Sequence, residues 1–178
     1  MGGRASKAAG RTPVAVALGS NRCHGRLGRP AAVVRAAAVA LAEGGIREMR
    51  LSRVIETAPI GPSRRRYANA VLVGRWAGEA HALFGLLKAT ERAFGRRPGG
   101  QAWGARVLDC DLIAFGAAVI VAPALVVPHP RMAARDFVMK PMRELWPGWR
   151  HPLTGLTVRH MAARLGRARP VDCGGPSP

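Results

Sequence analysis

The chain has 178 residues, enough for one domain with a single hydrophobic core. Lysine and arginine outnumber aspartate and glutamate by 28 to 10, and the resulting formal charge of +18 favours a polyanionic partner such as a nucleotide phosphate chain or nucleic acid. Three widely spaced cysteines, Cys23, Cys110 and Cys173, argue against a disulfide framework or a zinc site and for a reducing, cytoplasmic compartment.

Strand and helix patterns alternate along the chain after a basic arm, 1–12, that is expected to be disordered. Apolar periodicity, turn residues and helix-ending glycines predict a strand at Pro13–Leu18, a helix at Pro30–Glu43, strands at Arg47–Thr57 and Tyr67–Trp76, a helix at Glu79–Phe94 and a strand at Arg106–Gly116. The order β-α-β-β-α-β is that of a ferredoxin-like α/β (α+β) unit. Residues 117–165 are expected to add a C-terminal strand and short helices to the same domain, 13–165. The end of the chain, 166–178, reads as a flexible tail.

The segment Leu112–Pro128 carries no charge over 17 residues. It is short for a membrane-spanning helix, and Gly116 and Pro123 interrupt it. The apolar run Val14–Leu18 is too short for a signal peptide. We therefore expect strand, turn and strand in the first segment, and no membrane partner.

Asp109 and Asp111 are the most informative residues of the sequence. They are two positions apart in a predicted strand, so their side chains should share one face, with Cα atoms roughly 6.5–7 Å apart. Two carboxylates at the edge of a core repel each other and resist desolvation, and a pair of Mg²⁺ ions bound to a polyphosphate would compensate both effects. The alternative is an ordinary solvated strand face. Cys110 should point to the opposite side and pack in the core.

Short motifs follow one another from about Val14 to Trp146. They are Gly19-Ser20-Asn21, Thr57-Ala-Pro-Ile-Gly61, Tyr67-Ala-Asn69-Ala-Val71, Glu91 before Gly95-Arg96, Trp103–Asp111, Pro128–Met132 and Arg135-Asp-Phe137. Their order and spacing resemble the 6-hydroxymethyl-7,8-dihydropterin pyrophosphokinase family of the folate pathway, most specifically over 103–111 and 128–137. The resemblance implies a ferredoxin-like fold. It also implies transfer of pyrophosphate from ATP to the pterin hydroxymethyl group, with release of AMP.

The resemblance also implies roles for individual residues. Asp109 and Asp111 would bind two Mg²⁺ ions that bridge the ATP phosphates, and Arg96 and Arg106 would join them in catalysis. The predicted ATP contacts are Trp103, Arg106, His129 and Arg135; guanidinium groups suit phosphate because each binds two oxygens at once. The predicted pterin contacts are Thr57, Ala58, Tyr67, Asn69 and Phe137, with the two rings stacking on the pterin and the amide reading its edge.

Residue type and position alone leave other interpretations of these residues open. Tyr67 and Phe137 would be core residues, and His129 would be a loop histidine between prolines. Arg96 would be a solvated charge. Glu91 either fixes a loop arginine or is a charge on the surface of its helix.

The chain departs from the family pattern in its loops. Pro98 stands where the family has a second arginine, and Ala58 and Ala105 replace prolines. Either Arg97 takes over the missing role, or the loop closes less firmly over ATP. The run Arg64–Arg66 has no family counterpart and is expected to be solvated.

Three functions are compatible with these observations. The first is an active pyrophosphokinase, expected to be a monomer that binds ATP and a pterin and no specific nucleic acid. The second is a divergent paralogue that binds nucleotide or pterin with altered or lost turnover. The third is a basic ferredoxin-like RNA-binding module, against which the lack of an aromatic-rich central strand argues.

Overall fold

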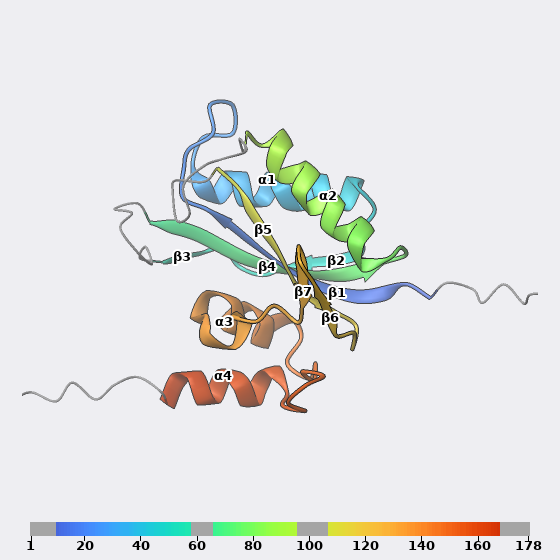
Figure 1. Cartoon of the computed structure of the whole chain (residues 1–178). Helices are drawn as coiled ribbons and strands as arrows, with labels where there is room; N and C mark the ends of the chain where they lie inside the picture. The colour runs from blue at the N-terminus through green and yellow to red at the C-terminus, as the bar shows by residue number, and fades with distance from the viewer. Residues whose placement is uncertain (1–9, 58–65, 96–106, 168–178) are drawn as a thin grey trace, which may run out of the picture.

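Strands and helices alternate along the chain in the computed structural model, which describes residues 10–57, 66–95 and 107–167 (Figure 1). The strands are β1 (Thr12–Ser20), β2 (Arg47–Leu51), β3 (Ile55–Thr57), β4 (Tyr67–Trp76), β5 (Asp109–Phe115), β6 (Ile120–Ala122) and β7 (Leu125–Val127). The helices are α1 (Pro30–Glu43), α2 (Ala80–Ala93), α3 (Asp136–Leu145) and α4 (Val158–Arg167), with a short 3-10 helix at Met132–Ala134. Within these ranges, none of the helices is long and apolar enough to span a membrane.

The main sheet is antiparallel, with the strand order β2-β4-β1-β5. Strand β3 pairs with the first residues of β4, along the same edge of β4 as β2. Helix α1 therefore connects two strands that have β4 between them, and α2 connects two strands that have β1 between them. This is the arrangement of a ferredoxin-like β-α-β-β-α-β unit, so the predicted fold class is confirmed. Strands β6 and β7 form a separate hairpin, and α3 and α4 follow it.

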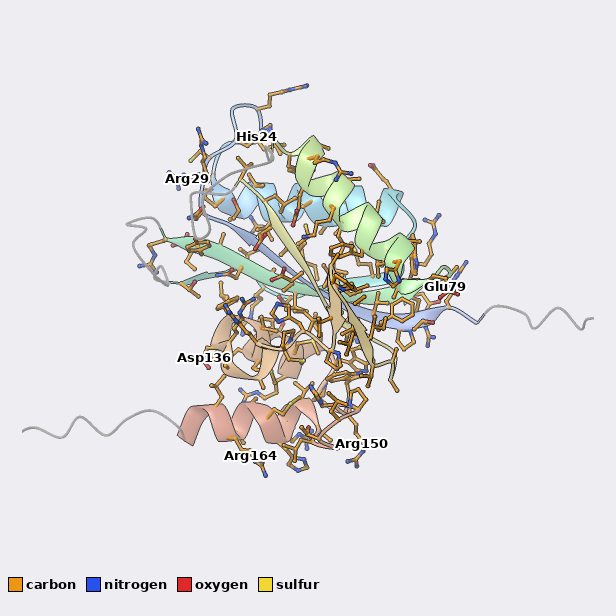
Figure 2. All side chains as sticks on the ribbon, in the orientation of Figure 1. His24, Arg29, Glu79, Asp136, Arg150 and Arg164 are labelled. Carbon is orange, nitrogen blue, oxygen red and sulfur yellow. The ribbon has the colours of Figure 1, made fainter. Side chains whose placement is uncertain are left out.

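Helices α1 and α2 cover one face of the sheet, and α3 and α4 lie on the other side (Figure 1). Strand β1 shows how one sequence serves both faces. Val14, Val16 and Leu18 pack with α1 and α2. Ala15 and Ala17, which alternate with them, pack on the side of α3 and α4. Successive side chains of a strand point to opposite faces, so a strand covered on both sides is apolar throughout. Side chains fill both layers between sheet and helices (Figure 2).

The prediction of one strand at Arg47–Thr57 is wrong, because β2 and β3 are separate. Ser52 lies in the break. Its N–H donates to the carbonyl of Val71 (2.9 Å), and its Oγ accepts the N–H of Val71 (3.1 Å). A side-chain oxygen thus takes the place of a backbone carbonyl, which keeps β4 paired where the edge strand is interrupted.

The other element bounds are close to those predicted. Strand β1 begins at Thr12, the last residue of the expected disordered arm, and continues to Ser20. Helix α4 ends at Arg167, beyond the expected domain boundary at 165. The remainder of the arm, 1–9, and of the tail, 168–178, lies outside the described residues.

Candidate functional site

Asp109 and Asp111 share the face of β5 that is turned toward α3, and both are half-buried. Cys110 lies between them and is fully buried on the opposite side, in the core with α1 and α2. Burial raises the pKa of the Cys110 thiol well above its ordinary value, and the charge of Glu91 raises it further. A neutral buried thiol is a poor metal ligand. The predicted alternation of faces along this strand is confirmed.

Two basic residues that were predicted to bind phosphate lie near the carboxylate of Asp111. Its Oδ2 lies 3.2 Å from Nη1 of Arg135, the residue before α3, and 3.8 Å from Nε2 of His129. The first distance allows a hydrogen bond from the guanidinium, and the second is too long for one. The backbone N–H of His129 donates to the carbonyl of Ile113 (3.0 Å), so β5 itself holds the imidazole beside the carboxylate.

The surroundings of His129 favour the neutral form of its imidazole ring. Burial lowers the pKa of its imidazole, the carboxylate of Asp111 opposes this shift, and the charge of Arg135 adds to it. Nδ1 accepts the backbone N–H of Arg131 (3.1 Å), so the proton of the neutral ring is on Nε2. Nε2 is the ring atom that faces Asp111, and it can donate to an anionic ligand bound there.

Gly19 separates Asp109 from the side chain that is predicted to read the pterin edge. In the antiparallel register, Asp109 is opposite Gly19 on β1, and Gly19 is opposite Asn69 on β4. A Cβ at Gly19 would lie 3.2 Å from Oδ1 of Asn69, so the absence of a side chain there allows the Asn69 amide to lie close over β1, in the same row as Asp109. Nδ2 of Asn69 donates to Oγ1 of Thr57 (2.8 Å), which orients the buried amide.

The two aromatic residues predicted to stack on the pterin come from different elements. Phe137 lies in the first turn of α3, and Tyr67 begins β4, opposite Thr57; both are half-buried. The guanidinium carbon of Arg135 lies 5.6 Å from the centre of the Phe137 ring, within cation–π range. The ring contacts found among the described residues do not include a Tyr67–Phe137 pair. Stacking of both rings on a pterin stays a prediction.

Several predicted site residues lie outside the described part of the chain. They are Ala58, Arg96, Trp103 and Arg106, together with Arg97, Pro98 and Ala105, where the chain departs from the family pattern. Of the run Arg64–Arg66, the structure describes Arg66, which is exposed and pairs with Glu56 (3.3 Å). This is the solvated arrangement that the sequence predicts for that residue.

Glu91 is buried, so its interpretation as a charge on the helix surface is wrong: it is 1% exposed. Its Oε1 accepts the backbone N–H of Cys110 (2.8 Å) and pairs with Nζ of Lys88 (2.7 Å). The sequence contained a signal for this burial, because Leu83, Leu87 and Glu91 follow at intervals of four residues and share one stripe of α2. Sequence reasoning missed Lys88 altogether.

Asp109 and Asp111 fit a cation that arrives with a polyphosphate. In the described ranges, no group of three or more His, Cys, Asp or Glu side chains is arranged to hold a metal ion. Mg²⁺ is commonly bound through one or two carboxylates, and water and phosphate oxygens complete its shell. Two carboxylates on one strand face match that pattern and do not match a structural metal centre built from protein ligands alone.

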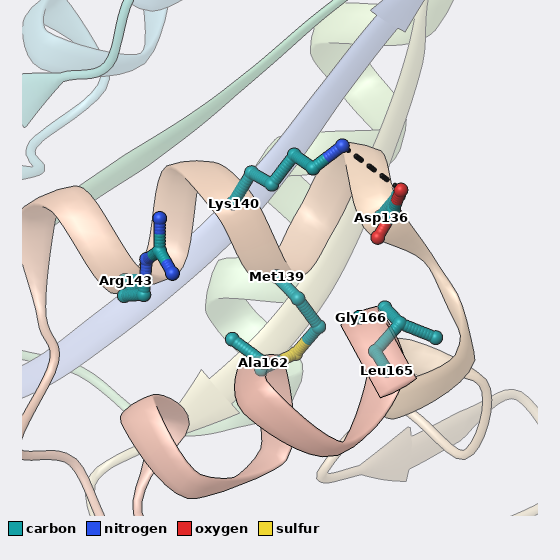
Figure 3. Close-up of a pocket in the computed structure, with 7 residues that line it drawn as sticks. All are labelled: Asp136, Met139, Lys140, Arg143, Ala162, Leu165 and Gly166. Carbon is teal, nitrogen blue, oxygen red and sulfur yellow. Dashed lines mark hydrogen bonds and ion pairs between the residues drawn. The ribbon is translucent and has the colours of Figure 1, made fainter. Parts of the chain in front are cut away.

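A separate cavity of about 190 Å³ lies between α3 and α4 (Figure 3). It is lined by Asp136, Met139, Lys140, Arg143, Ala162, Leu165 and Gly166. Nζ of Lys140 pairs with Oδ2 of Asp136 (2.9 Å). None of the residues that the sequence predicts for the site is among these lining residues, so this cavity is not the candidate site.

Comparison with known proteins gives relatives across most of the chain. A pyrophosphokinase from Pseudomonas aeruginosa, named 2-amino-4-hydroxy-6-hydroxymethyldihydropteridine pyrophosphokinase, is 36% identical over 143 residues, which cover 78% of this chain and 83% of that protein. A protein of the same name from Synechocystis sp. is 33% identical over 129 residues, 72% of this chain and 63% of that protein. The mitochondrial folate synthesis bifunctional protein of Arabidopsis thaliana is 35% identical over 133 residues, 74% of this chain and 23% of that protein. The chain thus spans less than two thirds of the length of the last two relatives.

Solved structures share the fold at low sequence identity. The crystal structure of Plasmodium falciparum HPPK-DHPS wild type matches with a TM-score of 0.67 and 12% identity, over 89% of this chain and 45% of that chain. A structure of HPPK-DHPS in complex with substrates matches with a TM-score of 0.65 and 11% identity, over 86% of this chain and 43% of that chain. The family model described as 7,8-dihydro-6-hydroxymethylpterin-pyrophosphokinase (HPPK) matches residues 15–147, well over half of the sequence. The chain therefore belongs to the 7,8-dihydro-6-hydroxymethylpterin-pyrophosphokinase family.

Proposed function

We propose that this chain transfers pyrophosphate from ATP to the hydroxymethyl group of 6-hydroxymethyl-7,8-dihydropterin and releases AMP. The observation that carries the proposal is a row of three residues across the sheet: Asp109 on β5, Gly19 on β1 and Asn69 on β4, with no side chain on the middle residue. A phosphate site beside Asp109 and a pterin site beside Asn69 would bring the reacting groups together. The names of the relatives in the family support the same reaction.

The ATP side of the proposed site is formed by the residues around Asp111. Arg135 lies within hydrogen-bond distance of that carboxylate, and His129 presents Nε2 toward it. When two Mg²⁺ ions enter with ATP, Asp109 and Asp111 would hold them, and they would neutralise phosphate charge and orient the phosphates. Arg135 would then be released from Asp111 to bind phosphate oxygens. Arg96, Trp103 and Arg106 stay predicted partners of the nucleotide.

The pterin side is proposed to lie over β3 and β4. Asn69 can both donate to and accept from the edge of a pterin, and Thr57 fixes which way its amide points. Tyr67 and Phe137 would stack on the flat ring system, and Ala58 would contribute to the wall. The binding energy is then divided between stacking, which tolerates many flat rings, and the amide, which selects for the pterin edge.

The chemistry needs one P–O bond to form and one P–O bond to break. The hydroxymethyl oxygen bonds to the β-phosphorus of ATP and its proton passes to solvent water, while the bond from that phosphorus to the α,β-bridging oxygen breaks. The bridging oxygen leaves with AMP, and the β- and γ-phosphates stay on the pterin. Negative charge is spread over phosphate oxygens during this step, so preorganised cations such as Arg135 stabilise the transition state more than the ground state.

Incubation of the purified chain with ATP, Mg²⁺ and the hydroxymethyl dihydropterin tests the proposal through the formation of AMP and the pterin diphosphate. Reactions that lack the pterin or the Mg²⁺ are the controls. Release of ADP instead of AMP would refute pyrophosphate transfer. Binding of ATP and pterin without AMP formation would favour the divergent paralogue, whose distinguishing loop residues lie outside the described part of the chain.

The monomeric state, the cytoplasmic location and the lack of a specific nucleic-acid partner stay predictions. Size-exclusion chromatography with light scattering measures the first. The third is tested by titration with RNA at physiological salt, where a non-specific polycation binds weakly and loses affinity steeply as salt rises. Tight, sequence-selective RNA binding would favour the RNA-binding alternative.

A further inference from the structure

Two side chains of α2 complete the hydrogen bonding of β5 where a neighbouring strand would otherwise be. Among the described strands, β5 is at the edge of the main sheet, and the outward backbone groups of an edge strand have no strand to pair with. At Cys110 the backbone N–H donates to Oε1 of Glu91 (2.8 Å), and Nζ of Lys88 donates to the backbone carbonyl (3.1 Å). The carboxylate stands in for a strand carbonyl, and the ammonium stands in for a strand N–H. We call Lys88 and Glu91 the α2 clip.

The α2 clip holds the one residue that separates the two carboxylates. On the other side of β5, Asp111 is opposite Ala17 of β1, and Asp109 is opposite Gly19. The backbone from 109 to 111 is therefore held from both edges. The directions of the two Asp side chains depend on the backbone dihedrals of this segment, so a rotation of the peptide planes at Cys110 would change the distance between the carboxylates.

A contribution to folding stability does not by itself explain an ion pair between Lys88 and Glu91 at this position. Glu91 is 1% exposed, and the side chain of Lys88 is 27% exposed. Removing these charges from water carries a desolvation cost, and well-packed apolar residues at such positions are often as stabilising as the ion pair. Leu83 and Leu87 already anchor the same helix in the core. The opposite charges of the α2 clip also cancel, so the clip orients the Asp segment without adding net charge behind it.

We propose that Lys88 and Glu91 are positioning residues that hold Asp109 and Asp111 at the spacing required to bind cations together with a polyphosphate. The inference builds on the proposed function, because it assigns the Asp pair to cation binding. It requires neither Lys88 nor Glu91 to touch a substrate. In this proposal the α2 clip acts through the backbone of β5.

Four variants of the full chain test the proposal. Glu91→Leu removes the acceptor, and Lys88→Met removes the donor while leaving a similar side-chain length. Glu91→Gln is the conservative variant, because its amide oxygen can still accept the N–H of Cys110. Lys140→Met is the matched control, since Lys140 pairs with Asp136 at 2.9 Å in an exposed position on α3.

The readouts separate positioning from stability. In the metal-free protein, amide hydrogen exchange at Cys110 should be at least about tenfold faster in Glu91→Leu than in the unmodified chain. Affinity for Mn²⁺ in the presence of ATP, measured by electron paramagnetic resonance, should fall about 10- to 100-fold, as happens when residues that orient metal ligands are lost. kcat should fall by a similar factor, while KM for the pterin stays within about twofold. Lys88→Met should show the same pattern, Glu91→Gln should stay within about threefold of the unmodified chain, and Lys140→Met should match it.

A clip that serves only stability gives a different result. Glu91→Leu and Lys88→Met would then unfold at lower temperature, yet their folded molecules would bind Mn²⁺ and turn over like the unmodified chain, which would overturn the proposal. If Glu91→Leu does not fold, the same measurements on Lys88→Met distinguish positioning from stability alone. If the unmodified chain binds Mn²⁺ with ATP but forms no AMP, the proposed function is refuted. The positioning role of the α2 clip is then tested by amide hydrogen exchange at Cys110 and by Mn²⁺ affinity. An unmodified chain that binds no Mn²⁺ with ATP refutes the clip.

Discussion

The face of the sheet under α1 and α2 and the face toward α3 are built by the same strands, yet their polar groups have different surroundings. Near the first face, Lys88 and Glu91 of α2 are bonded to each other and to the backbone of Cys110 at the edge of the sheet. On the second face, Asp109 and Asp111 are half-buried, and Asp111 pairs with Arg135, a residue proposed to bind phosphate. The alternation of a strand thus allows β5 to act as support on one side and as a site on the other.

This contrast has a consequence for mutations. Substitutions under α1 and α2, apart from the α2 clip, should change the free energy of unfolding and leave ligand binding alone. Substitutions of Asp111, or along the row from Asp109 to Asn69, should change ligand binding and leave the fold intact. Substitutions on both faces of the sheet test this division.

The largest effect is expected for Asp109→Ala or Asp111→Ala. Loss of a carboxylate that holds a cation removes several kcal/mol of transition-state stabilisation, so the rate of AMP formation should fall at least about a hundredfold. Circular dichroism and the unfolding midpoint should stay close to those of the unmodified chain. Asp136→Ala is the control, because this exposed carboxylate pairs with Lys140 and is not part of the row. Retention of more than about a tenth of the rate by either Asp variant would refute the cation-binding assignment.

A large effect on stability alone is expected for Leu41→Ala. Leu41 is fully buried on α1, and truncation of such a leucine costs about 2–5 kcal/mol of unfolding free energy. Chemical denaturation measures this cost. AMP formation per folded molecule should stay within about twofold, because the site is on the other side of the sheet. A drop in turnover without unfolding would show that the two faces are coupled.

An intermediate effect is expected for Gly19→Ala. The added methyl group would lie 3.2 Å from Oδ1 of Asn69, so the amide must shift by a few tenths of an ångström. Overpacking of this kind costs about 1–2 kcal/mol, which corresponds to roughly a 5- to 30-fold loss of pterin affinity. Isothermal titration calorimetry with the pterin measures it. Gly25→Ala, where a Cβ would meet nothing within 4 Å, is the matched control. Equal affinities for both variants would remove Gly19 from the site.

The smallest effect is expected for Thr57→Val, which keeps the shape of the side chain but removes the acceptor for Asn69. A neutral hydrogen bond contributes about 0.5–1.5 kcal/mol, so pterin affinity should fall roughly 2- to 10-fold with little change in kcat. Thr90→Val makes the same chemical change on α2, where the hydroxyl donates to the carbonyl of Leu86 (2.9 Å). If Thr90→Val weakened pterin binding equally, orientation of the Asn69 amide would not explain the loss.

Local patterns were sufficient for most of the architecture. The strand around Asp109, the helix at Pro30–Glu43 and the order of elements follow from apolar periodicity and from turn residues, which act over a few neighbouring positions. The shared face of Asp109 and Asp111 follows from the geometry of any strand. The burial of Glu91 could also have been predicted, because its spacing from Leu83 and Leu87 is a local property of the helix.

Most of the strands and helices, the shared side of Asp109 and Asp111 on β5 and the resemblance to the family could be predicted from the sequence alone. The folded structure was needed to show that Arg135 pairs with Asp111 across 24 residues of chain, that Gly19 lies between Asp109 and Asn69, and that β2 ends before Ser52. These two groups of features differ in their range along the chain. Periodicity and turns depend on neighbouring residues, whereas register and ion pairs between distant segments depend on how the whole chain packs.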